Sequence, residues 1–140
     1  MTGRYPFQSL KLSIAAICEY ALESRGRWTL VGTFRQLEFA AFPATLNRLE
    51  VYLLLTDVTT SGVSRLGLSL WPPSTDVGVE ELEPILQGRT PAGMAAFPES
   101  LEGVFRFTDV VFPTPGRYDL YVEVNDDVFE LITLFVRRSK

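Results

Sequence analysis

The sequence predicts an all-β fold in which two sheets pack face to face as a sandwich. Apolar and polar residues alternate with a period of two in several short runs, as they do in strands with one buried face. Turn-forming residues separate these runs at fairly regular spacing. Ten phenylalanines stand among 140 residues that are 46% hydrophobic, and aromatic residues favour strands. This length and composition fit a single domain over residues 1–140.

The first alternating run covers residues 10–18. The same apolar residues also fit one face of a helix, so a helical interpretation competes with the strand. We expect a strand to about Ile17, followed by a tight or short helical turn over residues 18–21. Glu-Ser-Arg-Gly at residues 23–26 then predicts a turn.

The second run begins at Trp28, and its alternation changes phase at Gly32. A glycine at such a change of phase predicts a β-bulge within the strand. Pro43 ends the strand because proline cannot donate a hydrogen bond to a neighbouring strand. Residues 49–58 and 66–70 predict two further strands, joined by a hairpin loop.

Residues 74–98 are the least regular part of the chain. An acidic stretch from Glu80 fits one helical turn, and the glycines and prolines after it predict a loop with at most one edge strand. Residues 103–112 return to strand alternation, and Pro-Thr-Pro-Gly at residues 113–116 predicts a turn.

The strongest strand pattern lies at the C-terminal end. Residues 116–124 place apolar side chains on one face and polar or charged ones on the other. Asn-Asp-Asp at residues 125–127 predicts a turn. Residues 128–136 are apolar on nearly both faces. We expect a hairpin whose second strand is either covered on both sides or packed against a partner.

These elements add up to about eight short strands with at most one short helical turn, which predicts an immunoglobulin-like two-sheet sandwich. Tyr118 follows Pro115-Gly116. By analogy with the tyrosine that ties a loop to a strand in such sandwiches, we expect its hydroxyl to bond nearby backbone.

Several short motifs occur in order along the chain: Ile17 to Ala21, Gly26 to Gly32, Phe42-Pro43, Val111 to Pro113 and Pro115 to Tyr118. Together they resemble a family of small bacterial β-sandwich domains of unknown function. The resemblance covers most of the chain. It implies a β-sandwich and supplies no catalytic residues.

Charge and composition argue against several functions. The formal net charge is −4 and no basic run is longer than Arg137-Arg138, so we expect no nucleic-acid partner. No stretch approaches the roughly 20 apolar residues of a membrane span. The single cysteine excludes an internal disulfide. We therefore expect no membrane partner and a cytoplasmic location.

The absence of histidine removes the commonest general base and metal ligand. Cys18 would need a nearby cation or base to form a thiolate, so we interpret it as a buried, small apolar side chain. The acidic residues around Asp127 and Glu130 lack the dense spacing of a calcium loop. We expect no cofactor, no metal and no enzymatic activity.

Five residues form the candidate interaction surface. Tyr52 and Tyr121 share the parity of polar neighbours and should point outward, while Phe129, Leu131 and Phe135 belong to a run with more apolar surface than one core needs.

Our main hypothesis is therefore a non-enzymatic protein-interaction or structural module, a subunit or accessory of a larger assembly, with a protein partner or a second copy. The alternative is a sandwich that binds a carbohydrate or another small molecule through an aromatic residue and residues 71–98. A carboxylate-based enzyme is the third hypothesis.

Overall fold

The computed structural model describes residues 11–56, 65–73, 83–91, 100–125 and 127–139. These ranges contain nine strands and no helix. In chain order the strands are β1 (Lys11–Ser24), β2 (Arg27–Thr33), β3 (Gln36–Phe39), β4 (Ala44–Thr56), β5 (Arg65–Trp71), β6 (Leu86–Pro91), β7 (Ser100–Phe112), β8 (Gly116–Val124) and β9 (Asp127–Arg138). None of the described segments is a helix long and apolar enough to cross a membrane.

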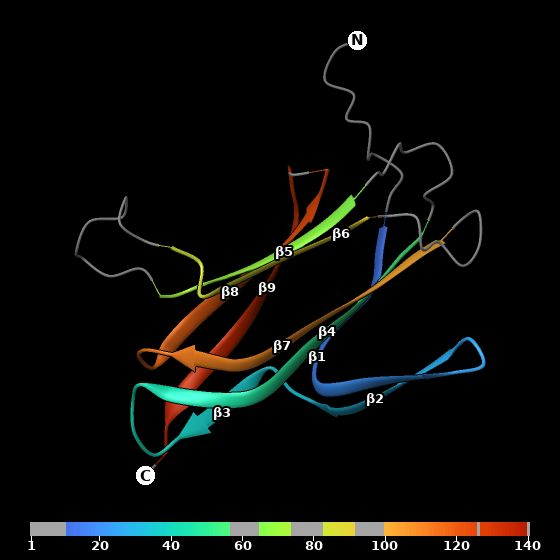
Figure 1. The fold of residues 1–140 in the computed structure, drawn as a ribbon. Coiled ribbons are helices and arrows are strands. Elements are labelled where there is room, and N and C mark those ends of the chain that lie inside the picture. Colours follow the sequence, from blue (N-terminus) through green and yellow to red (C-terminus); the bar gives the residue numbers. More distant parts are fainter. Residues whose placement is uncertain (1–10, 57–64, 74–82, 92–99, 126, 140) are drawn as a thin grey trace.

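The strands form two sheets that pack face to face (Figure 1). Sheet A has the order β2-β1-β4-β7, and sheet B has the order β3-β9-β8-β5-β6. Paired strands are antiparallel except β3 and β9, which are parallel. The fold is an all-β, immunoglobulin-like sandwich, as the sequence predicts.

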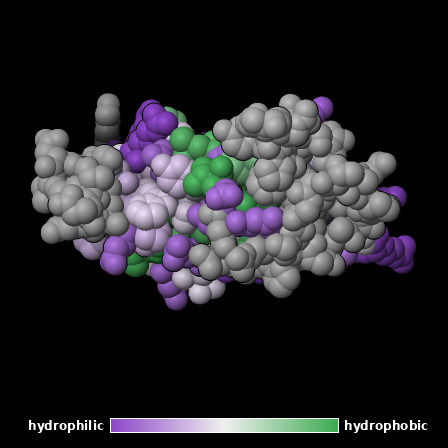
Figure 2. Space-filling view, turned by 90° about the horizontal axis from the view of Figure 1, so that it is seen from above, coloured by the Kyte–Doolittle hydropathy of each residue, from purple (hydrophilic) through white to green (hydrophobic). Residues whose placement is uncertain are grey.

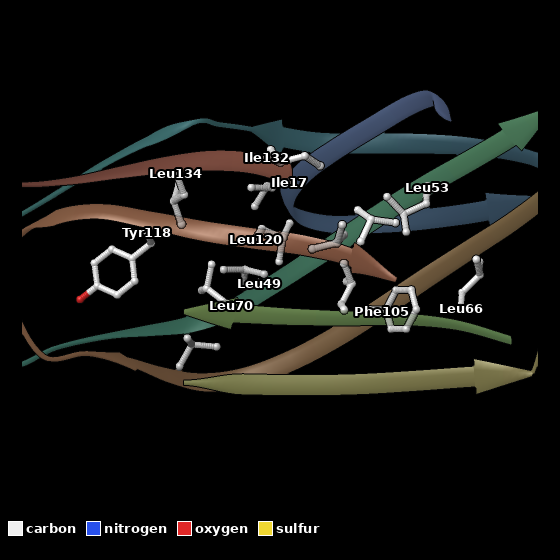
Figure 3. Close-up of a cluster of buried hydrophobic side chains, with 14 of the residues drawn as sticks. Ile17, Leu49, Leu53, Leu66, Leu70, Phe105, Tyr118, Leu120, Ile132 and Leu134 are labelled. Atoms are coloured by element: carbon white, nitrogen blue, oxygen red, sulfur yellow. The ribbon is translucent and has the colours of Figure 1, made fainter. Parts of the chain in front are cut away.

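The core lies between the sheets, where side chains from both meet (Figure 3). In β8 every second residue from Tyr118 to Val124 is buried. In β9 the buried residues are Ile132, Leu134 and Val136. This alternation confirms the predicted C-terminal hairpin, because a period of two sends one set of side chains into the core and the other outward.

Tyr118 fixes the entry to this hairpin. Its hydroxyl donates to the carbonyl oxygen of Thr114 at 2.7 Å and accepts from the Thr114 N–H at 3.3 Å. Its ring packs edge-on against Phe112, with centroids 5.2 Å apart. The expected bond between Tyr118 and nearby backbone is therefore confirmed.

β1 is longer than the sequence predicts. The expected helical turn over residues 18–21 is wrong, because the strand continues to Ser24. β1 changes its partner at Cys18: the residues before it pair with β4, and those after it pair with β2. The pairing with β4 and then with β2 keeps the chain extended. The local sequence pattern alone fits a helix as well as a strand here.

Gly32 marks a change of sheet rather than the predicted bulge. Its φ is +68°, which favours glycine, and a Cβ there would lie 3.0 Å from the Glu19 side chain. β2 ends one residue later in sheet A, and β3 begins at Gln36 in sheet B. Before Gly32, Trp28 packs against Tyr52 of sheet A, whereas after it Leu37 and Phe39 pack against the core from sheet B. The change of phase in the sequence therefore accompanies the change of sheet.

The remaining expectations fall partly outside the described residues. β6 is an edge strand of sheet B, as expected for one segment of residues 74–98. The hairpin loop expected after residue 58 and the helical turn expected to begin at Glu80 lie outside the described ranges.

Candidate interaction surface

The outer face of sheet B carries exposed apolar side chains from β8 and β9. Leu131 and Phe135 are 44% and 45% exposed. Tyr121, which is half-buried, lies directly opposite Leu131 in the register of the two strands. Paired residues of neighbouring strands project from the same face. We call Tyr121, Leu131 and Phe135 the apolar strip.

Polar side chains border the apolar strip. Arg117, which pairs with Phe135 in register, bonds the Asp119 carboxylate at 3.3 Å. Ser69 is opposite Tyr121 on β5, and its hydroxyl donates to a Glu123 carboxylate oxygen at 3.1 Å. The Nε1 of Trp71 in turn donates to the Ser69 hydroxyl at 3.0 Å. The strip is therefore bordered by polar side chains that are bonded to one another.

One face of the molecule shows hydrophobic residues at its surface. In the view from above, Figure 2 shows hydrophobic residues gathered near the centre of the coloured surface, with hydrophilic residues directly beside them. Apolar patches with polar borders are typical of interaction surfaces.

Two of the five predicted surface residues do not belong to the apolar strip. Phe129 is half-buried and packs against the core. Val122 pairs with Glu130 and Glu123 with Val128, so Phe129 is the extra residue of a bulge in β9 and the simple alternation fails there. Tyr52 lies in the other sheet and is only 5% exposed, so the expectation that it is exposed is wrong.

Tyr52 is buried because a hairpin covers the outer face of sheet A. The hairpin consists of residues 18–33, in which β1 pairs with β2; Figure 1 shows it beside β4 and β7. The rings of Trp28 in β2 and Tyr52 in β4 have centroids 5.7 Å apart. The Tyr52 hydroxyl donates to the Glu102 carboxylate of β7. Burial, together with this bond to Glu102 and its charge, raises the pKa of Tyr52 above its ordinary value.

Glu50 of β4 fastens the hairpin to sheet A. It is 1% exposed, although it alternates with the core residues Leu49 and Val51 and so points to the outer face. One carboxylate oxygen accepts the Ala21 N–H at 2.6 Å. The other lies 3.1 Å from Nε of Arg48 and 3.4 Å from Nε of Arg106. A buried carboxylate needs such partners, because an unpaired buried charge is strongly unfavourable.

Cys18 lies in the same buried layer and is fully inaccessible. It pairs with Glu50 in the register of β1 and β4. Burial, and secondarily the Glu50 charge, raises the pKa of the Cys18 thiol. The thiol is therefore kept in its protonated, unreactive form, which confirms the interpretation of Cys18 as a buried apolar side chain.

Sequence reasoning missed the Glu50 cluster. The signal was present, since Glu50 is an acidic residue inside the otherwise apolar run Leu49 to Leu55. Its partners Ala21 and Arg106 are distant in sequence, so local pattern could not identify them. Within the described ranges no three cysteine, aspartate or glutamate side chains gather closely enough to hold a metal ion.

The two sheets and their connections define an immunoglobulin-like β-sandwich domain. The chain belongs to the family of unknown function DUF6941, whose model matches residues 13–137. The match confirms the family resemblance that the short sequence motifs predict.

Similar solved structures include an immunoglobulin-like protein from Pseudomonas aeruginosa, 14% identical, with a TM-score of 0.45; the match covers 91% of this chain and 96% of that one. A β-glucosidase from Listeria innocua in complex with gluconolactone is 12% identical, with a TM-score of 0.49. That match covers 91% of this chain, which spans only 16% of the glucosidase. No curated protein matches the sequence.

Proposed function

We propose that this domain is a non-enzymatic protein-interaction module that docks onto a protein partner through the apolar strip, as a subunit or accessory of a larger assembly. The observation that carries the proposal is the exposure of Leu131 and Phe135, which are nearly half exposed while their neighbours Ile132 and Leu134 are buried. Covering exposed apolar area is favourable by about 25 cal/mol per Å². A protein surface laid over the strip would gain this free energy.

The chemistry around the strip supports a protein as the occupant. Tyr121 and Phe135 are aromatic, and aromatic residues are enriched in the centres of protein interfaces. The border carries both signs of charge, with Arg117 and Asp119 paired at 3.3 Å. An apolar centre with a polar, charged rim is the usual composition of such interfaces.

The side chains that could perform chemistry support a non-catalytic role. Cys18 is inaccessible and its pKa is raised. Both oxygens of the Glu50 carboxylate are engaged by hairpin or arginine groups. The sequence has no histidine to act as a general base. A cytoplasmic location belongs to the same proposal, because a lone free thiol gains nothing from an oxidising compartment.

The test is recovery of the tagged domain from its native cells, comparing the parent with an L131E/F135E double variant. We expect a stoichiometric protein partner with the parent and its loss with the double variant, because two carboxylates in the apolar centre would be desolvated on docking. The matched control is V111E, which alters a side chain that is 48% exposed on β7 of sheet A. The control should retain the partner.

Two outcomes would contradict the proposal. One is a monomeric domain from which no partner is recovered at any concentration. The other is a partner that survives L131E/F135E but is lost with V111E, which would move the interface to sheet A. If the tagged domain recovers only a second copy of itself, and the solution mass of L131E/F135E is half that of the parent, the strip is a site of self-association.

A further inference from the structure

A second site lies on the opposite side of the molecule, where the tip of the β1–β2 hairpin overhangs β7. A hollow of about 340 Å³ is lined there by Glu23, Gly26 and Trp28 from the hairpin and by Glu102, Gly103, Val104 and Arg106 from β7. Its volume is at the small end of the range for ligand pockets, about 300–1,000 Å³. We propose that this hollow binds a neutral sugar ring, with Trp28 as the stacking surface.

Trp28 offers a supported aromatic surface. It is half-buried, and the Tyr52 ring packs behind it at a tilt of 47°, with centroids 5.7 Å apart. Tyr52 is in turn held by its bond to Glu102. A stacking ring that is already fixed loses little conformational entropy when a ligand covers it.

The polar groups of the hollow match the hydroxyl groups of a sugar, which both donate and accept hydrogen bonds. Arg106 donates to the Ala21 carbonyl at 3.3 Å and pairs with Glu50 through Nε. These contacts fix the guanidinium but use only part of its five donors. Glu102 receives the Tyr52 hydroxyl on Oε2 and so keeps accepting capacity on its other oxygen. A donor and an acceptor, both held in place, therefore line the hollow beside an aromatic ring.

The charges of the hollow favour a neutral ligand. Arg106, 53% exposed at its side chain, opposes a cation. Glu23 and Glu102 oppose an anion. A neutral ring with several hydroxyls meets neither penalty, because it can bond both the guanidinium and a carboxylate.

Two other hollows among the described residues lack this combination. One, of about 400 Å³, contains Tyr20 and Glu19, but the guanidinium of Arg48 already covers the Tyr20 ring at 4.9 Å from its centroid. The other, of about 420 Å³, has no carboxylate in its lining and is formed largely by Ala15, Ala16 and Ile17. An open aromatic face beside a fixed donor and acceptor occurs only in the hollow of Trp28 among these three.

The experiment uses Trp28 as its own reporter. The chain has two tryptophans, and W71F removes the other one, which lies on sheet B. Glucose, galactose, mannose and N-acetylglucosamine are titrated into W71F up to about 50 mM, which covers dissociation constants in the millimolar range. We expect a saturable change in Trp28 emission with at least one sugar, and saturation transfer from the protein to that sugar's ring protons in NMR.

Two further variants locate the binding. W28L, read by saturation transfer, should weaken binding about tenfold, the loss expected for one aromatic contact. E102Q keeps an oxygen to accept the Tyr52 hydroxyl, so it should preserve the unfolding midpoint and weaken binding by about threefold or more through the lost charge. If W28L does not fold, the effect of E102Q on sugar binding tests the location of the site. W71L should leave binding unchanged.

Three results would overturn the proposal: no saturable response to any of the four sugars, binding that survives both W28L and E102Q, or a response to tetramethylammonium without a response to sugar. The last result would identify a cation site instead. The proposal is independent of the docking proposed for the apolar strip, because L131E/F135E should bind sugar as the parent does. Either proposal can therefore fail while the other stands.

Discussion

The outer faces of the two sheets differ in polarity and in exposure to solvent. On sheet A the outer face is polar at Glu50, yet that residue is 1% exposed because the β1–β2 hairpin covers it. On sheet B the outer face is apolar at Leu131 and Phe135, yet both are nearly half exposed. Burial by hydrophobicity alone would give the reverse.

This contrast separates a face that the chain covers itself from a face that the domain leaves open. The polar face of sheet A is covered by the chain itself, and each carboxylate oxygen of Glu50 has a defined partner. Satisfied buried polar groups fix one arrangement of the covering segment. The apolar face of sheet B gains free energy only when another molecule covers it. The first face explains how the hairpin is held, and the second explains why we propose a partner.

The largest expected effect is at Glu50. E50A should lower the free energy of unfolding by about 3 kcal/mol, because it leaves the buried Ala21 N–H without an acceptor and two arginines without a counter-charge. The side chains of Arg48 and Arg106 remain about half exposed to water, which keeps the loss toward the low end for a broken buried pair. Urea unfolding of parent and variant measures the difference.

The control for this comparison is E123A on sheet B. Glu123 is half-buried and accepts one hydrogen bond from Ser69, so its loss should cost about 1 kcal/mol or less. Equal losses for E50A and E123A would show that the Glu50 cluster does not hold the hairpin, and the contrast between the two faces would fail.

A smaller difference in stability is expected between variants of Tyr52 and Tyr121, the two tyrosines that point to the outer face of their sheets. Y52F removes the hydroxyl that donates to Glu102 and should lower stability by about 1 kcal/mol. Y121F changes a half-buried tyrosine of the apolar strip and should stay within about 0.5 kcal/mol of the parent. Chemical unfolding of both variants at neutral pH gives the two values. An equal loss in both would remove the distinction between a covered and an open face.

The same pair predicts a dependence on alkaline pH. The pKa of Tyr52 is raised in the folded state, so the folded protein holds this proton more tightly than the unfolded chain does. Its contribution is intact below the unfolded pKa of about 10 and is lost as pH rises through the higher folded pKa. Stability should therefore fall above about pH 10, less steeply in Y52F than in Y121F. The pKa of Tyr118 is also raised, so some slope remains in Y52F.

The sequence predicted those features that depend on local alternation. Tyr118 and Leu120 could be assigned to the core because they lie in a run whose period of two is unbroken. Leu131 could be assigned to a surplus apolar face because its run is apolar at both parities, and one core can bury only one of them. The bulge between β8 and β9 breaks that period at Phe129, and the assignment of Phe129 to the surface fails there.

What the sequence could not predict are the contacts across long separations. The parity of Tyr52 correctly placed it on the outer face, but its cover comes from Trp28 in a different hairpin. In the same way, β1 remains extended past Cys18 because first β4 and then β2 pair with it. Neither partner strand is encoded in the local pattern of residues 18–24.

The smallest expected change in stability is on the apolar strip. L131T and F135T should each alter the free energy of unfolding of the isolated domain by less than about 0.5 kcal/mol, since an exposed side chain away from caps and networks contributes little to the fold. Threonine is β-branched and is well accepted in strands, so a loss of stability could not be assigned to strand propensity. A loss above about 2 kcal/mol would mean that Leu131 and Phe135 are covered within the domain itself. A small loss of stability, combined with loss of the partner in L131E/F135E, would mean that these side chains are retained for binding rather than for folding.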